Sequence, residues 1–169
     1  MKTSRGWGRD DKIAKDDWET PDYLLKYASD LFGPFVLDAA ASDDNAKCSM
    51  WYTEEIDGLK APWVHKTWCN PPYKYKVAWI HKATEEMYNG VSSCLLLPAY
   101  TDVKIFHTHL WERPGVTVHF LPGRVKFIKA GITNTAPFGS MLCYFDSDYF
   151  NGPRQDTHEK AMSGLRTDT

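Results

Sequence analysis

One apolar run limits the folds open to this chain more than any other feature. Residues 93–98 read Ser-Cys-Leu-Leu-Leu-Pro, without the polar and apolar alternation of a strand that has one wet face. An unbroken run of this kind is typical of a central parallel strand covered on both faces. The sequence therefore predicts a mostly parallel sheet with helices on both sides.

Weaker patterns surround this central run. Strand-like segments lie at 35–41, 49–53, 67–69, 116–121, 125–128 and 141–145, and helical patterns lie at 20–32, 77–89 and 103–111. Strands alternate with helices early in the chain and follow one another late. This order predicts an α/β sheet with an antiparallel edge strand.

Two helices carry clear signals for their start or their buried face. Thr20 is expected to cap the first helix, with Pro21 in its first turn. Its apolar face is predicted to hold Leu24, Tyr27, Ala28, Leu31 and Phe32. The second helix repeats apolar side chains at spacings of three and four, at Val77, Ile80, Thr84 and Met87.

Length and composition bound the organisation of the chain. Its 169 residues support one good core, expected at 18–150, between a polar lead-in (1–17) and a mobile tail (151–169). No apolar run reaches the length of a membrane span and no signal peptide is visible, so we expect a cytoplasmic protein. The four cysteines lack the close pairs of a zinc site. We expect buried thiols and no metal.

Positive charge is concentrated in the middle of the chain. Residues 74–130 carry 8 basic and 4 acidic side chains, although the whole chain has a formal net charge of −2. Aromatic residues lie between these basic ones, a mixture suited to phosphate contacts and base stacking. The candidate DNA contacts are Lys74, Lys76, Arg124, Lys126 and Lys129. An ordinary solvated surface is the alternative.

The tetrapeptide Asn70-Pro71-Pro72-Tyr73 carries the most chemical information. Two prolines directly after a strand fix a rigid turn and leave carbonyl groups free. The Asn70 Oδ1 atom and the Pro71 carbonyl could each accept one N–H of a heterocyclic amine, while Tyr73 stacks on the ring. A simple turn at the end of a strand is the alternative.

Together with its context, this tetrapeptide resembles the phage and prophage DNA N6-adenine methyltransferases, which are Dam-like and depend on S-adenosylmethionine. Eight segments carry the resemblance in one order: WETPDYL (18–24), FVLDAAAS (35–42), NAKC (45–48), YTEEIDGL (52–59), WCNPPY (68–73), LLLPAYT (95–101), FLPGRVKF (120–127) and APFGSML (136–142). The resemblance implies a compact Rossmann-like methyltransferase fold and methylation of adenine in double-stranded DNA.

The resemblance also implies where S-adenosylmethionine binds. Thr20 and Pro21 match the family's segment for the methionine end of the cofactor. Asp38, Ala39 and Ala40 match the end of the first cofactor-binding strand, although alanines replace the glycine-rich loop of larger relatives.

Acidic residues further along the chain are candidates for the rest of the cofactor. Asp57 is the candidate contact for its adenine or ribose, and Glu54 or Glu55 for the ribose hydroxyls. Plain surface charge is the alternative for all three.

For the reaction, the Asn70-to-Tyr73 turn would supply the catalytic residues, after the target base has flipped out of the duplex. Target recognition has its best candidates in residues 124–135, including Asn134, and in residues 74–76. Two alternatives stay open: transfer to another planar amine, such as cytosine N4, an RNA base or a protein glutamine, and a catalytically silent protein that binds or masks DNA.

Overall fold

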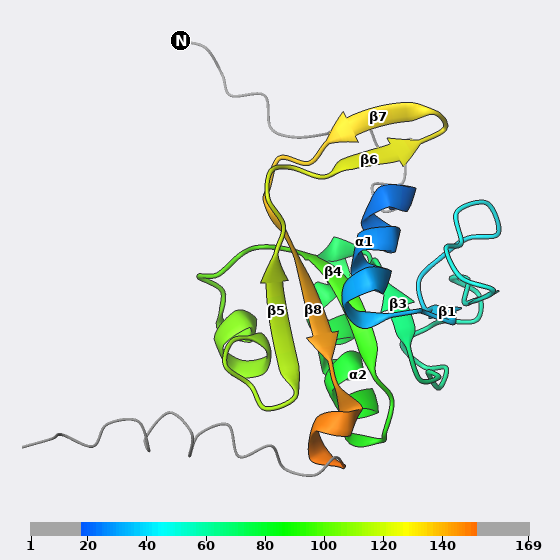
Figure 1. Ribbon diagram of the computed structural model, residues 1–169. Coiled ribbons are helices and arrows are strands. Elements are labelled where there is room, and N and C mark those ends of the chain that lie inside the picture. The colour runs from blue at the N-terminus through cyan, green and yellow to red at the C-terminus, as the bar shows by residue number, and fades with distance from the viewer. Residues whose placement is uncertain (1–17, 152–169) are drawn as a thin grey trace, which may run out of the picture.

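A computed structural model describes residues 18–151 of the chain. Its centre is a six-stranded sheet, shown in Figure 1, with the strand order β2-β1-β3-β4-β8-β5. The strands are β1 (Leu37–Asp38), β2 (Met50–Trp51), β3 (Thr67–Cys69), β4 (Ser93–Pro98), β5 (Val116–Phe120) and β8 (Ser140–Phe145). The predicted lead-in lies outside the described residues, as does the predicted tail beyond Asn151.

The pairing in this sheet confirms the predicted α/β class. The first four strands in spatial order pair in parallel, and β8 runs antiparallel to both β4 and β5. The antiparallel pairing lies at one edge of the sheet, as expected. The edge strand is β5, and β8, which runs opposite to all the others, lies next to it. The β1 and β2 strands are shorter than predicted, although bonds from Val36 N to Lys66 O and from Ala39 N to Trp68 O extend the contact between β1 and β3.

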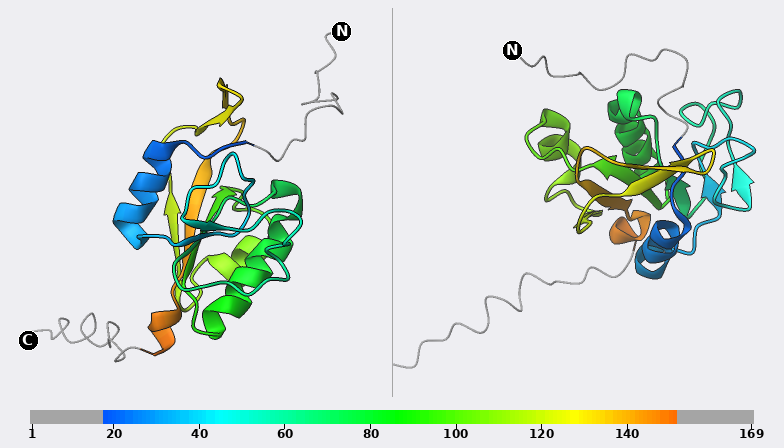
Figure 2. Two further views of the ribbon diagram at one scale, coloured as in Figure 1. Left: turned by 90° about the vertical axis from the view of Figure 1, so that its right-hand side faces the viewer. Right: turned by 90° about the horizontal axis from the view of Figure 1, so that it is seen from above.

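Helices cover both faces of the sheet (Figure 2). Helix α1 (Asp22–Phe32) buries Leu24 and Ala28 on one face, in a cluster with Trp68, Cys94, Leu96, Leu142 and Tyr144. Helix α2 (Lys76–Tyr88) covers the other face, in a cluster that includes Leu37, Cys69, Leu95, Leu97, Met141, Cys143 and Phe145. Neighbouring residues of β4 and β8 thus alternate between the two clusters, so both faces of these strands are dry.

The predicted apolar faces of both helices need correction. Tyr27 and Leu31 are exposed, and the Tyr27 hydroxyl instead lies 2.8 Å from Nε2 of His119, in the edge strand β5. Val77 is also exposed, because α2 turns Trp79 and Ala83 toward the sheet together with the predicted Ile80 and Met87. Spacing alone thus located the buried face of each helix only in part, since the predicted Leu24, Ala28 and Ile80 are buried.

A two-stranded ribbon projects from the sheet (Figure 1). It consists of β6 (Lys126–Lys129), close to its predicted position, and β7 (Ile132–Thr135), which the sequence patterns did not reveal. Ala130 and Gly131 join them with φ angles of 48° and 76°, as a type I′ hairpin turn requires. On its other side, β6 forms a bridge between Ile128 and Glu19, just before α1.

Short helical turns complete the described structure. They are η1 (Tyr73–Tyr75), the π-helical η2 (Phe106–Leu110) within the predicted helix at 103–111, and η3 (Ser147–Phe150). Three cysteines are buried free thiols as expected, and Cys48 is half-buried. Within residues 18–151, no helix is long and apolar enough to cross a membrane.

Candidate functional site

Three polar residues lie at the carboxyl ends of the parallel strands. Asp38 is the last residue of β1, and Asn70 directly follows the neighbouring strand β3. Thr20 reaches the same edge from the segment before α1, and its hydroxyl oxygen lies 3.2 Å from Asn70 Nδ2. In open α/β sheets this edge is where ligands bind. Thr20 and Asn70 are thus in contact at these strand ends, and Asp38 ends the neighbouring strand.

The Asn70 amide has a defined orientation. Its Nδ2 atom donates to Thr20 Oγ1 at 3.2 Å and to the Trp18 carbonyl at 3.4 Å. Within the described part of the chain, the Oδ1 atom has no such partner, which leaves its lone pairs available as acceptors. Pro71, the other predicted acceptor, is a buried residue that follows it in the same turn.

The bond from Asn70 also corrects the predicted start of α1. Pro21 is the N-cap residue of this helix, and no side chain caps it. The Thr20 hydroxyl accepts from Asn70 instead, so it serves the turn after β3 rather than the helix. The Pro21 carbonyl accepts the first helical bonds, from Leu24 N and Leu25 N.

Tyr73 lies in a small aromatic group beside Asn70. Its ring meets Phe138 edge-on with centroids 5.5 Å apart, and Phe127 with centroids 6.5 Å apart. Phe138 in turn meets the ring of Tyr100, which follows β4. The Tyr73 hydroxyl is buried without a hydrogen-bond partner among residues 18–151, and burial raises the pKa of this phenol. The aromatic group is therefore firmly packed, with one unsatisfied polar atom.

Asp38 organises the loop that follows β1. It is only 3% exposed, and burial raises the pKa of its carboxyl group to about 6. The carboxylate accepts bonds from Ala40 N at 3.3 Å and from Lys47 N at 3.1 Å, which lower the pKa in part. A buried carboxylate thus holds both ends of the 39–47 loop, including the small residues Ala39 and Ala40.

Lys47 connects this loop to the segment before α1. Its ammonium group lies 2.6 Å from Glu19 Oε1 and 2.7 Å from Asp22 Oδ1, and the side chain is only 10% exposed. Burial lowers the pKa of this amine, but the bonds to Asp22 and Glu19 outweigh it and the pKa is raised. Lys47 therefore links Asp38 to the start of α1.

Asp57 lies next to the first strand but is occupied by local contacts. It has a φ angle of 60°, accepts a bond from Leu59 N and pairs with Lys60 at 2.9 Å. This hydrogen bond to Lys60 lowers the pKa of the Asp57 carboxyl group. The backbone of the following Gly58 lies so close to Ala39 that a Cβ atom there would be only 2.1 Å from the Ala39 carbonyl oxygen. Glu54 and Glu55 are exposed nearby in the sequence.

The predicted DNA contacts lie in two places near this edge. Lys74 and Lys76 directly follow the Asn70-to-Tyr73 turn, with their ammonium groups over the rings of Tyr75 and Tyr100. Arg124 and Lys126 are exposed at the base of the ribbon and on β6. Lys129 is half-buried at the far end of β6, over the ring of Trp18.

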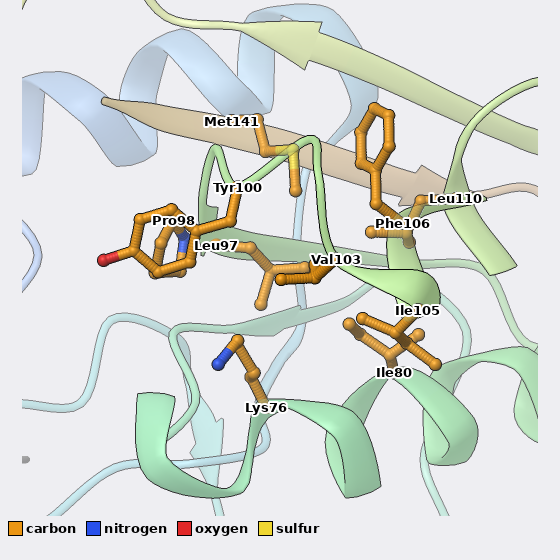
Figure 3. A pocket seen from close by; sticks show the side chains of 10 residues that line it. All are labelled: Lys76, Ile80, Leu97, Pro98, Tyr100, Val103, Ile105, Phe106, Leu110 and Met141. Carbon is orange, nitrogen blue, oxygen red and sulfur yellow. The ribbon is translucent and has the colours of Figure 1, made fainter. Parts of the chain in front are cut away.

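An apolar pocket lies on the α2 side of the sheet, below the segment that follows β4 (Figure 3). Figure 3 shows Lys76 rising from α2 toward Leu97 and Val103, with Met141 beyond them. Lys76 and Tyr100 are the only lining residues with polar side-chain groups. This pocket lacks the carboxylates and amides that would hold a ribose or an amino acid.

Sequence reasoning missed several side chains around the site. Lys47, Trp18 and Phe138 all lie within the segments that carry the resemblance, but nothing in their spacing revealed a role. The partner of Lys47 is Glu19, 28 residues earlier, and that of Phe138 is Tyr73. Such contacts depend on the tertiary fold. Within residues 18–151, no cluster of three or more histidine, cysteine or acidic side chains could hold a metal ion.

Comparisons with known proteins agree on one family. The model of the family described as DNA N-6-adenine-methyltransferase (Dam) matches residues 9–160. The chain is 37% identical to the DNA N-6-adenine-methyltransferase of Escherichia phage T1 over 87 residues, which are 50% of this chain and 37% of the phage protein. It is 34% identical to the protein of that name from Haemophilus phage HP1 over 120 residues, which are 69% of each chain. The match thus spans little more than a third of the first relative's length.

Proposed function

This chain belongs to the DNA N-6-adenine-methyltransferase (Dam) family, and from that premise we propose that it methylates the N6 amine of adenine in double-stranded DNA, with S-adenosylmethionine as the methyl donor. The observation that carries the proposal is the orientation of the Asn70 amide. Its Nδ2 atom is held by Thr20 and Trp18, so the Oδ1 atom is left to accept a bond from a substrate amine.

The adenine amine is a weak nucleophile because its lone pair is delocalised into the ring. Two fixed acceptors, Asn70 Oδ1 and the Pro71 carbonyl, would each bind one of its N–H groups and favour a more tetrahedral nitrogen. The same oxygens would stabilise the positive charge that develops on N6, until one proton leaves for water. No side chain has to titrate for this step.

Tyr73 would hold the target base beside these acceptors. Because N6 lies inside the duplex, the adenine must leave the base stack before it can reach Asn70. The ring of Tyr73 replaces the lost stacking, and its edge-on contacts with Phe127 and Phe138 keep that ring in place. The rigid turn through Pro71 and Pro72 fixes the distance between the ring and the acceptors.

The residues at the strand ends suit the proposed cofactor in the chemistry of their side chains. Thr20 and Pro21 would lie at its methionine end, Asp38, Ala39 and Ala40 would line its central part, and Asp57 with Glu54 or Glu55 would be nearest its ribose and adenine. The buried Asp38 carboxylate supports this assignment because it orders the loop beside the site. When bound, S-adenosylmethionine supplies an electrophilic methyl group on its sulfonium.

Basic residues on both sides of the turn would bind the DNA backbone. Lys74 and Lys76 flank the turn directly, and Arg124, Lys126 and Lys129 approach it from the ribbon. Phosphate contacts from these side chains would position the duplex so that one adenine faces Asn70.

Nucleoside analysis after incubation with unmethylated DNA tests the proposal. The purified chain and labelled S-adenosylmethionine should yield N6-methyladenine, and sequencing of the modified bases gives the target site. Asn70→Ala should lower turnover about 100-fold, the scale of losing one preorganised polar contact, while cofactor binding stays nearly unchanged. Methylcytosine as the product, or an Asn70→Ala protein with wild-type turnover, would contradict the proposal.

A further inference from the structure

The β6–β7 ribbon is joined to the site by three separate contacts. Glu19 and Ile128 exchange backbone bonds of 2.8 and 3.2 Å, which makes β6 the middle strand between Glu19 and β7. Phe127 is buried and meets the ring of Tyr73, and the Lys129 ammonium lies over the ring of Trp18. The ribbon therefore has a fixed position relative to the turn that holds Asn70.

The strand register shows which face of the ribbon is turned toward the site. Phe127 lies opposite Asn134, and Lys129 lies opposite Ile132. Residues opposite each other share a face, and so do alternate residues of one strand. Phe127 and Lys129 contact Tyr73 and Trp18, so this is the face on the site's side. Ile132 shares that face.

Ile132 is an unusual residue for its position. It is 68% exposed, directly after the type I′ turn, and every other residue of β7 is also exposed. The turn fixes the tip of the ribbon, because both Ala130 and Gly131 have positive φ angles. A branched apolar side chain is thus presented to solvent on a stiff support, and the exposed basic residues Arg124 and Lys126 lie toward the other end of the ribbon.

We propose that Ile132 enters the duplex next to the target adenine and fills the space that the flipped base leaves. This inference rests on the proposed function and names one residue that would make base flipping possible. Apolar wedges that separate base steps are a general device of DNA-bending proteins, and the basic flank of the ribbon complements the phosphates on either side.

The reach of the ribbon fits this role. Ile132 is level with Lys129, two residues beyond Phe127, which corresponds to about 7 Å along the strand. Phe127 itself lies with its ring centroid 6.5 Å from that of Tyr73. Ile132 is therefore on the same ribbon face as the residue that contacts the Tyr73 ring, and two positions further along.

Two duplexes that differ in the cost of flipping test the proposal. Both carry the target site found by sequencing, the first with thymine opposite the target adenine and the second with an abasic position there. Extrusion of an unpaired base costs less, so a wedge matters less on the second duplex. Ile132→Ala should lower kcat/KM about tenfold or more on the paired duplex and hardly at all on the abasic one.

Two further variants separate the wedge from other effects. Ile132→Leu retains apolar bulk and should stay near wild type on both duplexes. Leu31→Ala is the control, because Leu31 is also an exposed apolar residue but lies in the last turn of α1, outside the ribbon. Since both side chains are exposed, neither change should alter the melting temperature.

Different results would overturn the role of Ile132 and the proposed function. If Ile132→Ala is as active as wild type, or equally slow on both duplexes, Ile132 is not the wedge, although the proposed function stands. If the wild-type chain methylates no adenine in any DNA, the proposed function itself fails and this inference fails with it.

Discussion

The side-chain amide of Asn70 and the hydroxyl of Thr20 are joined by a hydrogen bond of 3.2 Å, across 50 residues of sequence. Thr20 is buried and accepts this bond from Nδ2, so the amide is held with its nitrogen toward the segment before α1. The Oδ1 atom is consequently the one that remains for a substrate. Thr20 therefore determines which end of the Asn70 amide a base would meet.

Replacing this hydroxyl should weaken catalysis through Asn70. We expect Thr20→Val to lower turnover roughly three- to tenfold, the kinetic equivalent of losing one neutral hydrogen bond, and Thr20→Ser to restore it. A double-mutant cycle identifies the route, because Thr20→Val should add little in a protein that already carries Asn70→Ala. Fully multiplicative losses in kcat would show that Thr20 acts independently of Asn70.

The unsatisfied hydroxyl of Tyr73 leads to a prediction about stability. Removing it in Tyr73→Phe should raise the free energy of unfolding by about 1 kcal/mol, since a buried O–H without a partner is costly. Tyr73→Phe should also stay active, whereas Tyr73→Ala should weaken capture of the base by about 1–3 kcal/mol through lost stacking. Tyr88→Phe, at an exposed tyrosine at the end of α2, is the control and should change neither quantity. A Tyr73→Phe protein that unfolds more easily than wild type would contradict this reading.

Much of the fold could be predicted because its signals are local. The unbroken run at β4 identified a strand covered on both faces, and the two prolines after β3 marked where a strand had to end. The β7 strand was not predicted, because its residues, Ile132–Thr135, are all exposed and show no pattern of buried positions. This strand forms only by pairing with β6, through a turn in which Ala130 has an unusual positive φ angle.

For the candidate site, the sequence indicated the chemistry of the side chains better than their contacts. Asn70 and Tyr73 were proposed from four adjacent residues, and Thr20 and Asp38 from the resemblance. The Thr20 hydroxyl was assigned to the wrong partner, because a capping signature is local and the bond that it makes to Asn70 is tertiary. Lys47 was missed for the same reason, since its partners lie 28 and 25 residues away.

The basic side chains beside the turn should make DNA binding depend on salt. We expect replacement of Lys74, Lys76, Arg124 and Lys126 by glutamine to weaken duplex binding and to flatten its salt dependence. Each lost phosphate contact reduces the slope of log K against log salt by about 0.9. Lys26→Gln is the control, because this exposed lysine pairs with Asp30 on α1, away from the turn. Equal slopes for the wild type and the fourfold variant would rule out this surface as the DNA face.

The Lys47 ammonium should matter for cofactor binding more than an ordinary surface lysine. Lys47→Met retains most of the bulk but leaves Glu19 and Asp22 without their shared cation. We expect the affinity for S-adenosylmethionine to fall about tenfold, as for the loss of a charged hydrogen bond, with kcat at saturation nearly unchanged. Lys26→Met is the control. It breaks the exposed pair with Asp30 on α1 and should hardly change the affinity for the cofactor. Calorimetry with equal cofactor affinities in both variants would contradict the role given to Lys47.

The raised pKa of Asp38 predicts opposite effects of pH on stability and on cofactor binding. Burial disfavours the charged form and raises the pKa of its carboxyl group in the fold to about 6, from the 3.8 of an unperturbed aspartate. Between these two values the folded chain binds more protons than the unfolded chain. The contribution of Asp38 to stability is therefore fully present below pH 4 and is lost as the pH rises through 6, by at most about 3 kcal/mol.

The ionised carboxylate, in contrast, is the form that best accepts the N–H groups of Ala40 and Lys47, so cofactor affinity should rise over the same range. Denaturant unfolding and cofactor titration at pH 5, 6 and 7 measure the two trends, and Asp38→Asn should flatten both, since an amide does not titrate there. Parallel pH profiles in wild type and Asp38→Asn would show that another group controls the loop beside the site.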